Sequence, residues 1–192
     1  MKKKILVLLL LIAACMCSAC KSDKYNIAYE VVYVSKSSKV EAVTFYSLSD
    51  YGDINTFNLL DDNRMTEYNY SVDGIAVSRK LSEVVGNKIK LVTTYNNFLA
   101  YDGYNGVPFM TGTVEESLLG FDYDAVFKSA LTDDEVSAEE VMSHKDLYVV
   151  IIQQDMNIIL DGQIVYYSDN VKLSNESHAV ATDDGLCYII FK

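Results

Sequence analysis

The sequence from residue 147 to residue 168 reads LYVVIIQQDMNIILDGQIVYYS, and this stretch sets the expected fold. Its first part, residues 147–153, is an apolar run of strand length that is rich in β-branched side chains. Its second part, residues 156–167, has apolar runs on both sides of Asp161-Gly162, a dipeptide that favours a tight hairpin turn. We therefore predict a strand followed by a hairpin. In that hairpin Ile159 pairs with Ile164, and Ile158 with Val165.

Similar patterns run through most of the chain. Residues 25–35 alternate in polarity, which predicts a long strand, and further strands are predicted at residues 40–48, 54–60, 88–95 and 171–173. Two more Asp-Gly dipeptides predict hairpins. The first, at Asp73-Gly74, would place Val72 opposite Ile75, and the second, at Asp184-Gly185, lies within residues 180–191. The sequence therefore predicts about eleven strands.

The pattern changes between residues 113 and 144. Sequences of the form Ser/Thr-x-x-Glu begin at Thr113, Thr132 and Ser137, and each fits a capping box, in which a hydroxyl and a carboxylate bind free backbone N–H groups. Short helices are therefore predicted at residues 114–119, 124–131 and 133–144. The expected fold class is α+β and β-dominated. It consists of a curved, half-barrel-like antiparallel sheet of about 8–11 strands, with two or three short helices inserted at about residues 114–144.

Composition limits the partners of this chain. Its formal net charge is −11. A surface with so much negative charge repels the phosphate backbone, so nucleic acid is not an expected partner. Residues 115–146 hold ten carboxylates against only Lys128 and Lys145, which is typical of a solvated helical face or, less often, of a docking site for a basic partner. We expect residues 21–192 to form a single β-rich extracytoplasmic domain.

Cysteine usage excludes two ways of stabilising that domain. Cys187 is the only cysteine after Cys20, so no disulfide can form within residues 21–192. Only two histidines are present, and a Cys/His metal cluster is not expected. No cofactor is expected either. Cys187 lies in an apolar run, where a small buried thiol is the usual role.

The first twenty residues have the layout of a signal peptide. Three lysines at positions 2–4 precede an apolar run, residues 5–14, and then a cluster of small residues and cysteines. As a helix the apolar run would be about 15 Å long, half the thickness of the hydrocarbon core, so it is too short for a permanent membrane span. We therefore expect the protein to be exported.

The end of this segment resembles a bacterial lipobox. Ile12-Ala13-Ala14-Cys15 is one match, and Cys17-Ser18-Ala19-Cys20 is a second. The resemblance covers residues 1–20 only. It implies that the sulfur of Cys15 or Cys20 is diacylglycerated and that this cysteine becomes the new N-terminus after cleavage. Acyl chains such as palmitate would then hold the protein on the outer face of the bacterial cell membrane. The alternative is ordinary secretion, with cleavage after Ala14 or Ala19.

One segment of the predicted domain has the composition of a binding loop. Residues 101–112 combine glycines with the only proline of the chain, which predicts an irregular loop. Four of its side chains are candidate ligand-binding residues, namely Tyr101, Tyr104, Pro108 and Phe109. The chain holds 15 tyrosines and no tryptophan, a composition that favours half-buried sheet faces over a sugar-binding platform.

No sequence motif of an enzyme is present, and no catalytic residue is expected. Ser174, Ser177 and His178 lie close in sequence, but the last predicted hairpin places His178 opposite Phe191, in a packing role. Two acidic pairs, Asp122 with Asp124 and Glu115 with Glu116, could act in catalysis but also fit helix starts. Acidic residues at 50–53, 61–63 and 183–184 lack the ligand spacing of an EF-hand loop, so a metal site is not expected.

Three functions remain open from the sequence. The first is a non-catalytic, lipid-anchored binding or interaction module with a protein or hydrophobic small molecule as partner. The second is a carrier of a lipid or hydrophobic ligand, because the strand count and helical block are similar in outline to the LolA- and LppX-like half-barrel carriers, although a helix before the first strand is missing. The third is a carboxylate-dependent hydrolase, which would need two acidic residues to converge in a pocket.

Overall fold

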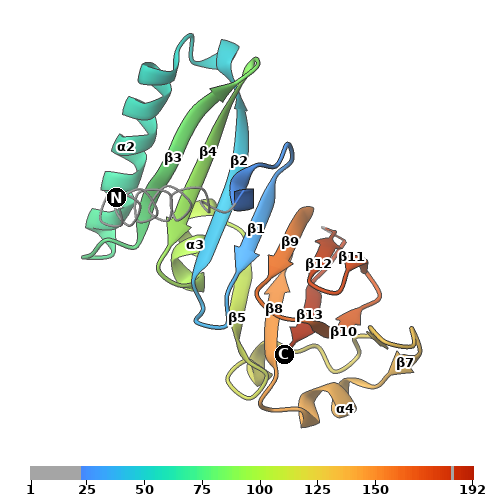
Figure 1. Cartoon of the computed structure of the whole chain (residues 1–192). Coiled ribbons are helices and arrows are strands. Elements are labelled where there is room, and N and C mark those ends of the chain that lie inside the picture. Colours follow the sequence, from blue (N-terminus) through green and yellow to red (C-terminus); the bar gives the residue numbers. More distant parts are fainter. Residues whose placement is uncertain (1–22, 183) are drawn as a thin grey trace, which may run out of the picture.

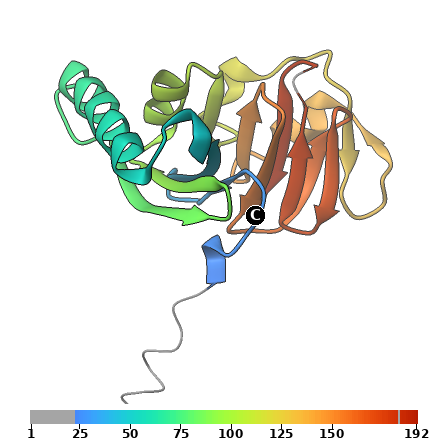
Figure 2. The same cartoon turned by 90° about the horizontal axis from the view of Figure 1, so that it is seen from above.

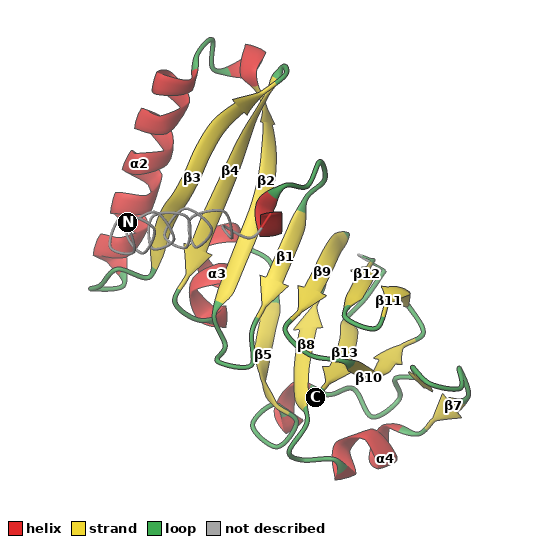
Figure 3. Cartoon of the chain, in the orientation of Figure 1, coloured by secondary structure: helices red, strands yellow, loops and turns green. Residues whose placement is uncertain are grey.

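The computed structural model describes residues 23–182 and 184–192, and the fold is α+β and β-dominated, as predicted. Thirteen strands form two curved sheets, accompanied within the described residues by three α-helices, α2, α3 and α4 (Figures 1 and 3). The predicted signal peptide, with Cys15 and Cys20, lies outside the described residues. None of the described helices is long and apolar enough to cross a membrane.

The first sheet has seven strands and joins distant parts of the chain. All its neighbouring strands are antiparallel except β1 and β9, which are parallel and pair Tyr33 with Ile159. From one edge to the other the strands are β11 (Val171–Asn175), β12 (His178–Ala181), β9 (Met156–Leu160), β1 (Val31–Val34), β2 (Val40–Ser47), β4 (Lys88–Tyr95) and β3 (Val77–Val85).

The second sheet has six strands and is antiparallel throughout. Its central strand is the last of the described chain, and all five of its residues are buried. In order the strands are β5 (Phe109–Thr113), β8 (Tyr148–Ile152), β13 (Cys187–Phe191), β10 (Ile164–Ser168), β6 (Phe127–Ser129) and β7 (Glu135–Val136).

The main core lies between the two sheets and under two of the helices. One buried cluster contains Val32 and Ile158 of the first sheet and Ile152 of the second. The same cluster includes Met65 from α2 (Ile54–Ser71) and Tyr101 from α3 (Phe98–Asn105). These two helices therefore cover the part of the inner face of the first sheet that the second sheet leaves uncovered. A second cluster lies between the other face of the second sheet and α4 (Ala138–Ser143).

The longest helix corrects the strand predicted at residues 54–60 and the hairpin at Asp73-Gly74. Helix α2 begins after Asp53, whose side chain accepts hydrogen bonds from the backbone N–H groups of Asn55 and Thr56 at 2.7 and 2.9 Å. Its buried side chains are Phe57, Asp61 and Met65, one turn apart. The Asp73-Gly74 dipeptide follows the helix end, so Val72 and Ile75 do not pair across two strands.

Two further hairpins were predicted wrongly, for one physical reason. Strands β9 and β10, on either side of Asp161-Gly162, lie in different sheets, and so do β12 and β13. Ile159 pairs with Tyr33 and His178, not with Ile164, and Ile164 pairs with Phe191. Their apolar runs suggested pairing within a single sheet. In the structure the two runs of each pair belong to different sheets and pack against each other across the core.

The remaining differences are local. Residues 25–35 contain only the short strand β1, and residues 101–112 form the end of α3 and the start of β5 in place of the predicted loop. The helix predicted at residues 114–119 is replaced by a turn and a 3₁₀ turn (η3, Leu118–Gly120), and the helix predicted at residues 124–131 is replaced by turns and strand β6. Within residues 133–144 only α4 is α-helical. Thr113 and Glu116 do form the reciprocal capping bonds, at 2.9 and 3.2 Å, around a single turn.

Candidate functional site

The outer face of the first sheet, opposite its core face, carries the most developed polar arrangement among the described residues. Strand register assigns Tyr33, Glu41, Thr94 and Ile159 to this face, because they are neighbours in the β9–β1–β2–β4 ladder. Residues 23–30, which we call the strap, contain the 3₁₀ turn η1 (Asp23–Tyr25) and pack on this face. Figure 2 shows η1 on the side of the strands away from α2 and α3.

One end of the strap is held by a charged cluster centred on Glu41. The Tyr25 hydroxyl donates to the Glu41 carboxylate at 2.6 Å, and the Lys80 ammonium donates to the same carboxylate at 2.6 Å and to Tyr25 at 2.7 Å. Lys24 forms a further ion pair with Glu41. Its ammonium also lies 4.5 Å from the centre of the Tyr33 ring, a cation–π contact.

This cluster keeps the Glu41 carboxylate ionised. Burial raises the pKa of Glu41, but the hydrogen bonds from Lys24, Lys80 and Tyr25 outweigh burial and lower that pKa to about 2. The Tyr33 hydroxyl donates to the backbone carbonyl of Lys24, which fixes the strap to β1. At neutral pH the site therefore holds a negative charge between the ammonium groups of Lys24 and Lys80.

The other end of the strap lies on β12. The Tyr29 ring stacks on the His178 ring with a centroid distance of 6.1 Å and an interplanar angle of 7°. Asn157 links the two segments, because its amide nitrogen donates to the carbonyl of Glu30 at 3.0 Å while its amide oxygen lies 3.2 Å from the His178 imidazole. Burial lowers the pKa of His178, which favours the neutral ring.

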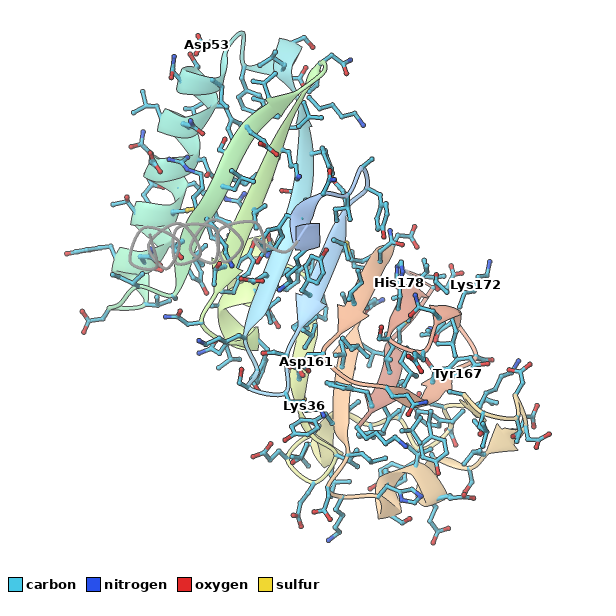
Figure 4. All side chains as sticks on the ribbon, viewed as in Figure 1. Lys36, Asp53, Asp161, Tyr167, Lys172 and His178 are labelled. Carbon is cyan, nitrogen blue, oxygen red and sulfur yellow. The ribbon has the colours of Figure 1, made fainter. Side chains whose placement is uncertain are left out.

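A groove of about 420 Å³ lies beside the charged cluster. Its apolar lining comes from β1 and β9, with Tyr33, Ile159 and Leu160 among the lining residues. Its polar lining comes from the strap, the β1–β2 turn, strands β2 and β4, and the chain after β9. These polar residues are Lys24, Ser35, Ser37, Lys39, Glu41, Thr94 and Asp161. Figure 4 shows Asp161 near Lys36, whose backbone N–H donates to the Asp161 carboxylate at 2.9 Å.

An apolar floor with charged walls suits an amphiphilic ligand. The volume falls in the range of small-molecule sites, which is about 300–1,000 Å³. Lysine ammonium groups on the rim would meet an anionic head group, and the apolar floor would take a short hydrocarbon or aromatic portion. The sequence did not single out this groove, since its walls come from four separate segments.

The candidate binding residues predicted at 101–112 are distributed differently. Tyr101, Tyr104 and Phe109 are buried in the main core, with exposures of 3%, 8% and 3%. Burial raises the pKa of both tyrosines, and the Tyr101 hydroxyl donates to Gln154 at 3.2 Å. Pro108 is exposed. These side chains do not line the groove, and their contact with a ligand stays a prediction.

The residues weighed for catalysis or metal binding have other contacts. His178 pairs in register with Ile159 and not with Phe191, so its predicted neighbour was wrong. All four carboxylates of the two acidic pairs are exposed, and Asp122 and Glu116 accept backbone bonds in local turns. Asp61 pairs with Arg79. Among the described residues there is no group of three or more His, Cys, Asp or Glu that could hold a metal ion.

Comparison of the chain with family models, with curated proteins and with solved structures finds no match.

Proposed function

We propose that this chain is a non-catalytic binding module that works on the outer face of a bacterial cell membrane, held there by lipid on Cys15 or Cys20. The observation that carries the binding role is the groove, with its apolar floor at Tyr33 and Ile159 and its charged walls. The basis for the anchor is the lipobox-like sequence, which ends immediately before the strap. The occupant that fits this lining is an amphiphile, either a small molecule or the end of a protein partner.

The second candidate is a carrier of a lipid or another hydrophobic ligand. It is favoured by one observation, the apolar residues that the groove takes from β1 and β9. A carrier would hold the apolar part of its ligand against Tyr33, Ile159 and Leu160. An interaction module would engage the rim without retaining a ligand through purification.

Native mass spectrometry of the full chain, extracted from bacterial membranes, tests the groove. Thr94 lines the groove, so Thr94→Trp would obstruct it. Ser78 is the register neighbour of Thr94 on the edge strand and does not line the groove, which makes Ser78→Trp the matched control. We expect bound ligand, or partner captured from the envelope, to be lost from Thr94→Trp and retained by Ser78→Trp. Equal binding by the two variants would contradict the proposal.

The anchor is tested separately by the intact mass of the purified chain. We expect an N-terminal fragment that carries diacylglycerol, and the fragment identifies the modified cysteine. Cys15→Ala and Cys20→Ala, made singly, should differ, since only one of them removes the lipid. A released chain without lipid, cleaved after Ala14 or Ala19, would refute membrane anchoring and leave the groove experiment unaffected.

A further inference from the structure

The apolar floor of the groove continues beneath the strap. Val31 lies two residues from Tyr33 on β1, so both side chains belong to the outer face of the first sheet. Register extends the row of Val31 through Val43 on β2 and Val92 on β4 to Leu81 on β3. We call this row, Val31, Val43, Val92 and Leu81, the trough. Neighbouring strands lie about 4.8 Å apart, so the trough is about 14 Å long.

The trough and the groove share one apolar surface, of which the trough is the covered part. Val31, Val43 and Val92 are 0% exposed although they lie on an outer face. The strap covers them, because Tyr25 and Ile27 pack against their cluster. The same cluster reaches the groove floor on β1 and β9. The strap therefore occupies a site that an apolar ligand in the groove would otherwise reach.

Side-chain contacts alone hold the strap in place. Among the described residues, no hydrogen bond between two backbone groups joins the strap to a strand. Its bonds to the sheet each involve a side chain, as where Asn157 donates to the carbonyl of Glu30, and the backbone N–H of Phe45 donates to the Glu30 carboxylate at 3.2 Å. Most of its side chains are exposed. A segment with so few buried contacts opens at a low free-energy cost.

The borders of the trough limit what fits in it. On one side the neighbouring row contains Glu41 and Thr94. On the other side it contains Lys90 and Glu83, which form an ion pair at 3.3 Å. Successive rows on one face of a sheet lie about 7 Å apart, so the trough has the width of a single apolar row between two polar ones. It therefore has room for one hydrocarbon tail.

We propose that the trough is a second section of the binding site, which the strap occupies until an amphiphile with one long hydrocarbon tail displaces it. The inference rests on the proposed function, because the same ligand would begin in the groove at Tyr33 and Ile159. Strands β1, β2 and β4 each have a neighbour on both sides, so their backbone groups bond within the sheet and the trough presents apolar side chains. A hydrocarbon tail, which has no hydrogen-bonding groups, matches that floor.

Tail length decides whether the strap leaves. Displacement replaces one apolar cover by another, since a tail in the trough would shelter the residues that Tyr25 and Ile27 shelter now. The free energy gained by burying a tail grows with the apolar area that it buries. A short tail ends in the groove and leaves the strap bound, whereas a long tail gains the trough only by releasing the strap.

Photocrosslinking of the full chain, kept soluble in amphipol, locates the tail. The probes are octyl phosphocholine and hexadecyl phosphocholine, each with a diazirine at the end of its tail. Their head group carries both charges, as do the groove walls at Lys39 and Asp161. We expect the octyl probe to label Ile159 on β9 and the hexadecyl probe to label Val92 or Leu81. Labelling of β9 by both probes, with none in the trough, would overturn the proposal.

Tryptophan fluorescence reports release of the strap in the same samples. The chain contains no tryptophan, so Tyr29→Trp places a single reporter in the strap, where the native side chain is 42% exposed. We expect the hexadecyl probe to raise quenching of this reporter by acrylamide about two-fold, since release exposes the rest of the side chain. The octyl probe should leave quenching unchanged. An unchanged value with the bound hexadecyl probe would mean that the strap stays in place and would overturn the proposal.

A matched pair of strap variants tests competition for the trough. Ile27→Ala removes an apolar contact with the trough, whereas Asn26→Ala changes an exposed neighbour, and neither residue lines the groove. We expect Ile27→Ala to increase labelling of Val92 by the hexadecyl probe several-fold and to leave octyl labelling of Ile159 unchanged. Asn26→Ala should match the wild type. Equal hexadecyl labelling in the two variants would contradict the strap as the competing occupant.

Thr94→Trp separates this inference from the proposed function. Octyl labelling of β9 that this variant abolishes, with no hexadecyl labelling of Val92 or Leu81 in the wild type, would support the groove and refute the trough. Hexadecyl labelling of Val92 or Leu81 that persists in the variant, with no octyl labelling of β9 in either protein, would refute the groove and support the trough.

Discussion

The guanidinium of Arg79 lies 3.2 Å from the carboxylate of Asp61, beneath helix α2. Arg79 also contacts the carboxylate of Asp62 at 2.6 Å and donates to the carbonyl of Asn58 at 3.2 Å. The Asp61 side chain is only 7% exposed, and that of Arg79 is 21% exposed. This buried ion pair links the longest helix to the edge strand β3.

Arg79→Ala should destabilise the fold by about 3 kcal/mol, because it leaves the Asp61 carboxylate buried without a partner. Burial raises the pKa of Asp61, and Arg79 opposes that rise. The variant should therefore lose more stability at neutral pH than near pH 4, where Asp61 can protonate. Urea unfolding gives the free energies, and Asp61→Asn combined with Arg79→Ala should recover part of the loss. An unchanged midpoint in Arg79→Ala would contradict a structural role for this pair.

Glu41→Gln should lower the free energy of unfolding, and the size of this loss should depend on pH. The folded pKa of Glu41 is about 2, below that of an unfolded glutamate, so its contribution is complete above about pH 4.5 and is lost as the pH falls toward 2. We expect a loss of about 1 kcal/mol at neutral pH, less than the full shift implies, because Lys24 and Lys80 are partly in solvent. Chemical unfolding across this pH range measures it. A parallel pH dependence in wild type and variant would contradict the assignment.

His178 should make the strap sensitive to mild acid. Burial holds the folded pKa of His178 below its usual value near 6.5, so its contribution to stability is present above about pH 6.5 and is lost as the pH falls through the folded pKa. Hydrogen exchange of the backbone amides at residues 26–30 should therefore accelerate at about pH 5 relative to pH 7.5, after correction for intrinsic rates. His178→Gln should show a smaller change. The same acceleration in that variant would assign the effect to another group.

Gly162→Ala should destabilise the second sheet. A Cβ at Gly162 would lie 2.3 Å from the backbone carbonyl oxygen of Lys192 and 2.9 Å from the Phe191 ring, so the β9–β10 connection would have to move away from β13. We expect a loss of at least about 2 kcal/mol in urea unfolding. Gly74→Ala is the matched control, because a Cβ at Gly74 meets nothing within 4 Å and its backbone has no left-handed φ. Equal midpoints for the two variants would contradict the close approach at Gly162.

The fold class and several strands could be predicted because their signals are local. Strand β4 (Lys88–Tyr95) has the predicted bounds, and β2 ends one residue before its predicted end. Helix α2 could not be found this way, since most of its eighteen residues are polar and its buried residues are only three. The Asp73-Gly74 dipeptide suggested a hairpin here, whereas contacts of α2 with β3, and of Tyr68 with Tyr104 of α3, favour the helix.

The candidate site was only partly open to prediction. Tyr25 and Tyr33 fall in the segment that was predicted as one long strand, but their rings meet, at 5.9 Å between centroids, because the strap packs on β1. The bond from Lys80 to Glu41 joins residues 39 apart and depends on a register shift between Arg79 and Leu81. The position of such a bulge is set by packing of the whole sheet, so no local sequence pattern predicts it.

The order of strands has a consequence for when the chain can fold. Strand β1 lies between β2 and β9, and β13 lies between β8 and β10, so each sheet needs residues beyond position 155 to fill its interior. A growing chain that has emerged only as far as α3 cannot complete either sheet. We expect it to stay unfolded until nearly all of it has been made, and an unfolded chain of this kind would be competent for the proposed export as an extended polypeptide.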